Sequence, residues 1–389
     1  MKSLSLKRIA LALSVATLPV TAFAGVADDI KHPLWYQAPS EKTMELAKID
    51  DLSNVVVSQG QRGEEGFPAS KLAITDEQLA KIKAGNFTVG ISMGWLGDDW
   101  ASQQLIGLKE TFEKLGIKVV AETNANWDDA KQISDLEAIG VLKPDLVVSI
   151  PLNGSTTASA YQALAAAGTK IVFIDQAADG MEPGKDYAAI ISSDNLALGM
   201  YLADELADAI GGKGDVGAMY FANDFYVTNL RYEGFIARVL AKYPDMNVVV
   251  AAGHNDPNKG QEVAQGVLAR YPNLNGLYAS WSIPAMGAAT AALTAGRTPD
   301  DFKIVNENFD QIVAGNMAEG GFIAGISSQR PYDQGVAEAT VGALALIGEK
   351  TPSYVVVPPL KVERSNLAEA YKTIYRTDLP ADMQSALSQ

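Results

Sequence analysis

The chain has 389 residues, of which 48% are hydrophobic and 20% are charged, a composition typical of a folded globular protein. A chain of this length is too long for one ordinary hydrophobic core and suits a protein of two lobes. The formal net charge of −15 disfavours nucleic acid and anionic lipid as partners, because both repel an acidic surface. The chain has no cysteine, which excludes a thiolate nucleophile, disulfide bonds and a lipid anchor on an amino-terminal cysteine.

Residues 1–24 have the pattern of a secretory signal peptide. Lys2, Lys7 and Arg8 form a basic start, residues 9–20 form an apolar run, and the segment ends in the small-x-small sequence AFA. The run is shorter than the roughly 20 apolar residues that span a bilayer. Loss of this segment would take the formal net charge from −15 to −18. We therefore expect an exported protein, and without a lipid anchor the periplasm is the compartment that would retain it.

Residues 25–85 form a long lead-in before the first expected strand. The segment 32–40 should be extended, because its two prolines restrict their neighbours, and 59–70 reads as a polar, glycine-rich loop. Residues 75–85 predict a short helix with Thr75 as its N-cap and Gln78 three positions later. The sequence suggests no function for this lead-in beyond packing along a domain flank.

From residue 87 onward, short apolar segments alternate with amphipathic ones, which predicts strands that alternate with helices. Segments such as DLVVSI and KIVFID are nearly continuous apolar runs, as buried parallel strands are. After a first strand near 87–91, the predicted strands are 117–122, 145–150, 170–174, 188–191, 215–220, 247–252, 276–280, 302–307, 322–327 and 354–358. The predicted helices include 128–140, 154–167, 195–210, 228–243, 257–270, 284–295 and 331–348. So many strands predict an α/β fold with two doubly wound parallel sheets and a cleft between them.

The loop after the first strand is the first candidate binding element. Its sequence GWLGDDW carries Trp95, Asp98, Asp99 and Trp100 at the carboxyl end of the strand, where open α/β sheets bind ligands. Two indoles beside hydrogen-bonding carboxylates suit a small polyhydroxylated molecule. The alternative is a surface loop with Trp95 packed into the core.

Polar and aromatic residues also follow the later strands. Any one of them could be structural, and Asn153 or Ser155 could instead cap the next helix, but their recurrence at successive strand ends predicts a shared cleft. A carboxylate accepts hydrogen bonds from adjacent hydroxyls, and the guanidinium of an arginine donates two at once. The candidates are Asn153, Asp175, Gln176, Arg231, Trp281, Glu307, Asn308, Asp310 and Gln329.

Motifs of enzymes and cofactor sites are mostly missing. The chain has two histidines, His32 in the lead-in and His254 in a turn, so a histidine-based triad or metal cluster has little support. GGKGD (211–215) follows a helix and precedes a strand, the reverse of a phosphate-binding loop, and reads as a helix C-cap. DPNKGQE (256–262) lacks the regular acidic positions of a calcium loop. We expect no catalytic residue, metal or cofactor, and a monomer.

Residues 86 to about 360 resemble the periplasmic sugar-binding proteins of the ribose-binding type, the type I substrate-binding components of ABC transporters. The resemblance rests on VGISMG with Trp100, FIDQ, ISSDN, RYEGF, YASWSIPAMGAATAAL and SSQRPYDQG. It implies two α/β lobes joined by a three-segment hinge, with sugar bound between them. The implied division is a signal peptide (1–24), an extension (25–85), an N-terminal lobe (86–193 and 330–356) and a C-terminal lobe (194–329 and 357–389).

The resemblance also implies ligand-binding roles for several candidates. Asp175 would grip sugar hydroxyls, Arg231 would bind from the second lobe, Gln329 would contact the ligand near the hinge, and Trp100 would stack on the sugar ring. The ribose type has an arginine directly after the aspartate, whereas this chain has Gln176 there. The ribose type also has an asparagine-aspartate pair after a later strand, whereas this chain has Trp281 and Ser282. In NENFD we favour Asn308 as the contact. The loss of an arginine argues against ribose and against an acidic ligand, and favours a neutral sugar or polyol.

Two other functions remain open. The protein could present its ligand to a chemoreceptor or sensor kinase instead of a permease. An exported carbohydrate-active enzyme could use Asp98 and Asp175 as acid and base, although only the two carboxylates support this alternative. A repressor is disfavoured, because no basic helix-turn-helix precedes the first lobe.

Overall fold

The computed structural model describes residues 32–33, 36 and 38–389, so the expected signal peptide lies outside the described residues. The strands are β1 (Phe67–Pro68), β2 (Thr88–Met93), β3 (Lys118–Asn124), β4 (Leu146–Ser149), β5 (Lys170–Ile174), β6 (Ala189–Ser193), β7 (Gly214–Phe221), β8 (Met246–His254), β9 (Gly276–Ala279), β10 (Lys303–Glu307), β11 (Ile323–Ser328), β12 (Tyr354–Val357) and β13 (Leu360–Val362). The α-helices are α1 (Glu41–Leu46), α2 (Asp76–Ala84), α3 (Asp99–Leu115), α4 (Asp129–Val141), α5 (Ala158–Ala166), α6 (Asn195–Ile210), α7 (Tyr226–Lys242), α8 (Gly260–Arg270), α9 (Ser282–Thr294), α10 (Gln311–Ala318), α11 (Pro331–Leu346), α12 (Leu367–Tyr375) and α13 (Ala381–Leu387).

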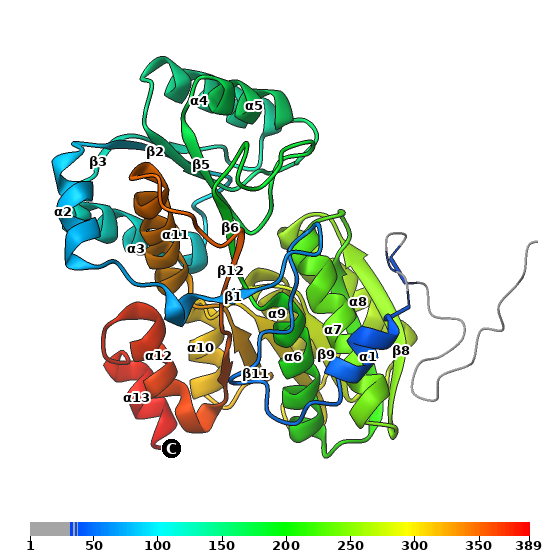
Figure 1. Ribbon diagram of the computed structural model, residues 1–389. Coiled ribbons are helices and arrows are strands. Elements are labelled where there is room, and N and C mark those ends of the chain that lie inside the picture. The colour runs from blue at the N-terminus through cyan, green and yellow to red at the C-terminus, as the bar shows by residue number, and fades with distance from the viewer. Residues whose placement is uncertain (1–31, 34–35, 37) are drawn as a thin grey trace, which may run out of the picture.

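The strands form two separate sheets, one in each lobe. The first has the order β1-β12-β6-β5-β4-β2-β3 and the second the order β13-β11-β10-β9-β7-β8. All pairings are parallel except that of β13 with β11. Helices cover both sheets, and the two lobes lie one above the other in Figure 1. The predicted fold of two doubly wound parallel-sheet lobes is confirmed.

The chain passes between the two sheets at three points. It leaves the first sheet after β6 and enters the second. After β11 it returns to the first sheet by way of α11 and β12, and between β12 and β13 it crosses to the second sheet again. The first and third crossings lie side by side, because the Asp194 nitrogen after β6 donates to the Val357 carbonyl of β12 at 3.1 Å. In Figure 1, β6 and β12 run next to each other through the middle of the molecule. The three crossings form the three-segment hinge that was predicted.

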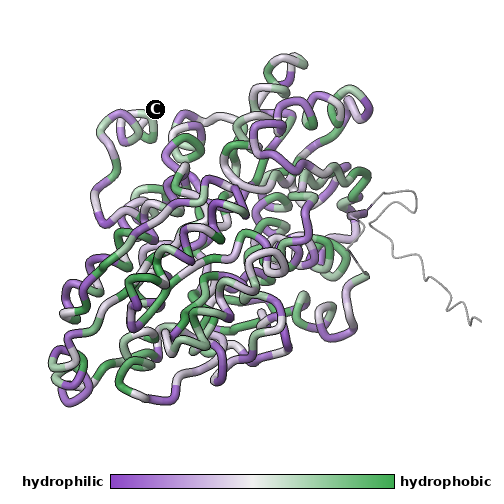
Figure 2. The backbone as a smooth tube through the Cα atoms, turned by 90° about the horizontal axis from the view of Figure 1, so that it is seen from above, coloured by the Kyte–Doolittle hydropathy of each residue, from purple (hydrophilic) through white to green (hydrophobic). Residues whose placement is uncertain are grey.

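Hydrophobic periodicity explains most of the elements, and hydrophobic and hydrophilic residues alternate along most helices in Figure 2. The expected capping box of α2 is present: the Thr75 side chain accepts from the Gln78 backbone and the Gln78 side chain from the Thr75 backbone. Sequence periodicity did not predict β1 and β13, because strands of two and three residues carry no recognisable alternation. Among the described helices, none is long and apolar enough to cross a membrane.

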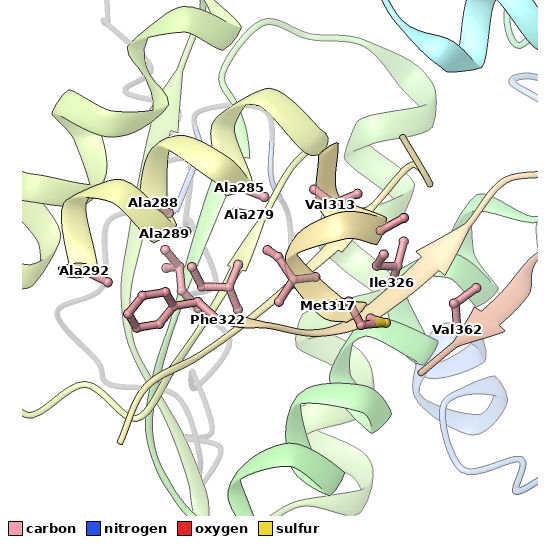
Figure 3. Close-up of a cluster of buried hydrophobic side chains, with 14 of the residues drawn as sticks. Ala279, Ala285, Ala288, Ala289, Ala292, Val313, Met317, Phe322, Ile326 and Val362 are labelled. Carbon is pink, nitrogen blue, oxygen red and sulfur yellow. The ribbon is translucent and has the colours of Figure 1, made fainter. Parts of the chain in front are cut away.

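Small residues let the helices approach closely. In the second lobe, alanines along one face of α9 pack against β9, β10 and α10, and Figure 3 shows Ala285, Ala288 and Ala292 in the cluster that also holds Phe322 and Val313. Between helices, a Cβ on Gly199 of α6 would collide with the carbonyl oxygen of Arg231 in α7. This glycine therefore fixes the position of the helix that carries Arg231.

The lead-in crosses the molecule on one flank. Ala47, Leu52 and Val57 pack with Leu196 of α6 and Ala237 of α7 in the second lobe. The chain then reaches the first lobe, where β1 pairs with the edge of β12. In Figure 1 this blue segment runs past α6 and α7 before it reaches β1. The lead-in thus contacts both lobes.

Candidate functional site

A cleft of about 980 Å³ lies where the carboxyl ends of strands from both sheets face one another. This volume is at the upper end of the range for small-molecule sites. The first lobe lines it through the loops after β2, β3, β4 and β5. The second lobe lines it through the loops after β7, β8, β9 and β10. The principal lining side chains are Trp95, Asp98, Trp127, Asp129, Asn153, Gln176, Asp179, Phe221, Asp224, Tyr226, Asp256, Trp281, Asn308 and Asp310.

The eleven predicted site residues fall into two groups. Those that line the cleft are Trp95, Asp98, Asn153, Gln176, Trp281 and Asn308. Those that do not line it are Asp99, Trp100, Asp175, Arg231 and Gln329. The second group lies behind the cleft wall or at the hinge, so direct ligand contact by its members stays a prediction.

Indole rings form one face of the cleft. Trp95 is stacked between two other indoles, with ring centroids 4.2 Å from Trp127 and 5.2 Å from Trp100. Trp281 of the second lobe comes within 6.1 Å of Trp127 and 4.7 Å of Phe221. Such a surface matches the apolar C–H face of a sugar ring or a polyol chain.

Trp95 is held in place by Asp98, which also caps α3. One carboxylate oxygen of Asp98 accepts from the Trp95 indole nitrogen at 2.9 Å, and the other accepts from the Ala101 backbone nitrogen at 2.8 Å. Asn153 similarly accepts from the backbone nitrogens of Ser155 and Thr156. These bonds close a turn ahead of α5, whose N-cap is Thr157, so Asn153 lines the cleft but does not cap the helix.

Backbone strain is concentrated at the ends of the strands that face the cleft. Trp127, Asp175, Trp281 and Asn308 have φ values of 62°, 61°, 67° and 75°, a left-handed conformation that residues other than glycine seldom adopt. Each costs of the order of 1–3 kcal/mol and persists only where the surroundings impose it. Such strain is typical of residues held in place for binding.

A buried polar network lies behind the cleft on the hinge side. Asp175 accepts from the Ser192 hydroxyl at 2.9 Å and from the Gln334 amide at 3.0 Å. Burial raises the pKa of Asp175, and the nearby Arg231 guanidinium opposes this shift. The Asp175 carboxylate is thus oriented by hinge residues.

Arg231 belongs to the same buried region. Its Nε donates to the Asn195 side chain at 2.8 Å, and its guanidinium lies 3.5 Å from the Glu307 carboxylate. Both charged side chains are essentially inaccessible to solvent. Burial raises the pKa of Glu307, and Arg231 counteracts that rise. Arg231 therefore compensates a buried carboxylate that the sequence did not connect to it.

Three other candidates support the site from the hinge side. The Trp100 ring is buried against Trp95, and the Gln329 amide donates to the Asn308 side chain at 2.8 Å. Asp99 accepts from the Tyr375 hydroxyl at 2.7 Å and from the Gln311 backbone nitrogen at 2.9 Å, which links α3 to the second lobe. The side chain of Asp99 is thus engaged in an interlobe contact.

The cleft is acidic. Among the residues that the structure describes, its lining includes six aspartates and no lysine, arginine or histidine. Asp310 is buried, and burial together with Asp98 and Asp99 raises its pKa to about 7. No group of three or more histidine, cysteine or acidic side chains among the described residues has a geometry that could hold a metal ion. Such a lining repels anions and offers acceptors to hydroxyl groups.

The prediction of site residues missed Trp127, which follows β3 just as Trp95 follows β2. The same reasoning from strand ends would have found it, because it stands between a predicted strand and a predicted helix. Gln61 of the lead-in also lines the cleft. Nothing in its local sequence indicated this, because it comes from a loop outside the strand–helix alternation.

The comparisons with known proteins agree with this architecture. A family model described as "Periplasmic binding protein domain" matches residues 89–350, and the chain belongs to this family. It is 27% identical to the ribose import binding protein of Bacillus subtilis over 59% of this chain and 75% of the relative. It is 26% identical to the D-apiose import binding protein of Actinobacillus succinogenes over 71% of this chain and 86% of the relative. A solute-binding protein of a carbohydrate transporter from Agrobacterium radiobacter, solved with D-arabinose, matches with a TM-score of 0.65 and 25% identity over 73% of this chain and 97% of that one.

Proposed function

We propose that the protein captures a neutral monosaccharide or polyol in the interlobe cleft and delivers it to the membrane permease of an ABC transporter. The observation that carries this proposal is the lining of the cleft, where indoles from both lobes accompany hydrogen-bonding side chains and where the described part of the chain places no basic residue. Hydroxyl groups donate to the carboxylates, and C–H faces lie on the indoles. The names of the ribose and D-apiose relatives, and the D-arabinose in the related structure, support this ligand class.

Ligand capture would couple to closure of the lobes. A ligand that contacts both lobes binds the closed state more tightly than the open one and shifts the population towards it. The lobes would comprise 86–193 with 330–356 and 194–329 with 357–389. The crossings after β6, after β11 and between β12 and β13 support this division.

The wider setting of the protein is proposed from its sequence and its relatives. It would be exported by residues 1–24, act as a monomer in the periplasm and need no cofactor. Presentation of the ligand to a chemoreceptor is the second possible role. The enzymatic alternative is less well supported, because Asp98 is bonded to Trp95 and a helix N-terminus and Asp175 to Ser192 and Gln334.

A thermal-shift screen of the purified protein against pentoses, hexoses, their deoxy forms and C4–C6 polyols tests the ligand class. The protein is first unfolded and refolded to remove carried-over ligand. A ligand at about 100 times its dissociation constant should stabilise the protein by about 2.7 kcal/mol. One strong response among neutral sugars or polyols is the expected result, and a uniformly flat screen would contradict the proposal.

Replacing Trp127 with alanine should weaken binding of that ligand by about 1 kcal/mol, because it removes a stacking surface. Trp127 is 47% exposed, so its loss should leave the unfolding transition nearly unchanged. Trp127→Phe keeps a smaller ring and should lose less affinity. Calorimetric titration measures the dissociation constants of the wild type and the two variants. Wild-type affinity in Trp127→Ala would show that this indole does not contact the ligand.

A further inference from the structure

The lead-in contributes a side chain to the cleft although it lies outside the region that matches the family. That region begins at residue 89, whereas Gln61 is a lining residue of the cleft. The loop that carries Gln61 is a closed hairpin turn. Gln59 and Glu65 pair in antiparallel fashion, Gly60 N donates to Glu64 O at 2.9 Å, and Gly63 adopts a φ of 83°. The turn presents Gln61 at its tip in a defined position.

The hairpin is anchored beside the first hinge crossing. Asp194, which lies between β6 and α6, accepts from the Val57 nitrogen at 2.7 Å and from the Ser58 nitrogen at 3.0 Å. The Ser58 hydroxyl also donates to Asp194 at 2.7 Å and accepts from the Leu196 nitrogen at 2.9 Å. These groups are buried, so the bonds hold the chain firmly at the pivot between the lobes.

The hairpin also contacts the rims of both lobes. The Gln61 side-chain oxygen accepts from the Ala177 nitrogen of the first lobe at 2.8 Å. The Tyr226 hydroxyl, at the start of α7 in the second lobe, donates to the Gln59 carbonyl at 2.7 Å. Both Gln61 and Tyr226 line the cleft. The hairpin therefore bridges one open side of the cleft.

The bond to Ala177 fixes the orientation of the Gln61 amide. Because the oxygen accepts from a backbone N–H, the NH2 group occupies the other branch of the amide and offers two donors. The neighbouring Gln176 donates its own amide to the Pro151 carbonyl at 2.9 Å. The aspartates of the cleft supply hydrogen-bond acceptors, whereas a ligand oxygen that acts as an acceptor needs a donor. The oriented Gln61 amide supplies one.

We propose that the hairpin 59–65 holds Gln61 in the wall of the ligand cleft and that Gln61 donates a hydrogen bond from its amide to an oxygen of the bound sugar or polyol. This inference rests on the proposed function and adds a specificity-determining residue from outside the family-matched region. Ligands that lack an oxygen at the matching position lose this bond, so the lead-in helps to select among sugars.

The test compares Gln61→Ala, Gln61→Glu and the control Arg62→Ala, which lies in the same hairpin and does not line the cleft. Each variant is titrated calorimetrically with D-ribose, D-apiose, D-arabinose, xylitol and the sugar or polyol that gives the largest thermal shift. Gln61→Ala should bind the preferred ligand about three- to tenfold more weakly, as expected for one hydrogen bond. Gln61→Glu keeps an acceptor for Ala177 but replaces the donors by a negative charge, so it should bind more weakly still. Arg62→Ala should bind as the wild type does.

Specificity separates a direct contact from a structural role. A direct contact should change the order of preference among the sugars, because only some of them place an oxygen near Gln61, whereas a purely structural loss would weaken all of them by one factor. Thermal unfolding without ligand checks that the variants fold. Wild-type affinities and order of preference in both Gln61 variants would overturn this inference and leave the proposed function intact. A wild-type protein that binds none of the sugars or polyols would overturn the proposed function and this inference with it.

Discussion

Replacing Arg231 with alanine is expected to lower the free energy of unfolding by about 3–5 kcal/mol, because it leaves a buried carboxylate without its partner. Glu307 is inaccessible to solvent and lies 3.5 Å from the guanidinium. The substitution also removes the donor to Asn195. Chemical denaturation of the variant and the wild type measures the difference. A loss below about 1 kcal/mol would contradict the assigned role of the pair.

The same variant should show a defined pH dependence. Burial already raises the pKa of Glu307 above its usual 4.5, and removal of Arg231 takes away the charge that opposes this rise. A carboxyl group whose pKa is higher in the folded than in the unfolded protein destabilises the folded state once the pH rises above the unfolded-state pKa. The deficit of Arg231→Ala should therefore be smaller at pH 5 than at pH 8. A deficit independent of pH would show that Glu307 does not respond to Arg231.

Arg238 supplies a matched control on the same helix. It is equally buried and pairs with Asp204 at 2.7 Å, and it also donates to the carbonyl oxygens of Ala47 and Ile49. Arg238→Ala should destabilise the protein to a similar extent. Arg238 donates to the lead-in at Ala47 and Ile49, upstream of the hairpin 59–65 that Asp194 anchors, and it does not belong to the network behind the cleft, so Arg238→Ala should leave sugar affinity unchanged. Arg231→Ala should weaken binding as well, because it disturbs the region around Asp175.

Replacing Asp194 with alanine should cost about 3 kcal/mol or more. The substitution strands the backbone N–H groups of Val57 and Ser58 and the Ser58 hydroxyl, and each buried unsatisfied donor costs about 1–3 kcal/mol. It also removes the N-cap of α6. The lead-in should then detach more often, so trypsin should cleave faster after Lys48 and Arg62. Denaturation and timed proteolysis measure the two effects.

Asp128 is the control for the capping part of this loss. It caps α4 by accepting from the Lys131 nitrogen at 3.0 Å in an exposed position. Asp128→Ala should cost only about 1 kcal/mol and leave cleavage of the lead-in unchanged. Equal losses in the two variants, with equal proteolysis, would mean that Asp194 does not hold the lead-in.

The strand–helix order and the cleft followed from local patterns in the sequence. Buried parallel strands such as β4 and β5 are continuous apolar runs, and glycines such as Gly211 end helices in a left-handed conformation. The residues directly after such strands must meet at the carboxyl edges of the sheets. That geometry brought Trp95, Gln176, Trp281 and Asn308 to one cleft.

The orientation of charged side chains could not be predicted in this way. Arg231 pairs with Glu307 and Asp175 with Gln334, partners that are distant in sequence and that only the fold brings together. The position of the lead-in could not be predicted from the sequence either. Its anchor on Asp194 lies more than a hundred residues away, and β1 has only two residues. Local periodicity contains no information about such contacts.

A bound ligand should close the two lobes, and because the chain has no cysteine, dyes on two introduced cysteines can measure this closure directly. Cysteines in place of Val141 at the end of α4 and Leu293 in α9, which are 80% and 69% exposed, can carry a donor and an acceptor dye on opposite lobes. The sugar or polyol identified by the thermal screen should change the energy transfer, and the change should saturate with the dissociation constant found by calorimetry. Energy transfer that stays constant while the ligand binds would contradict capture by closure of the two lobes.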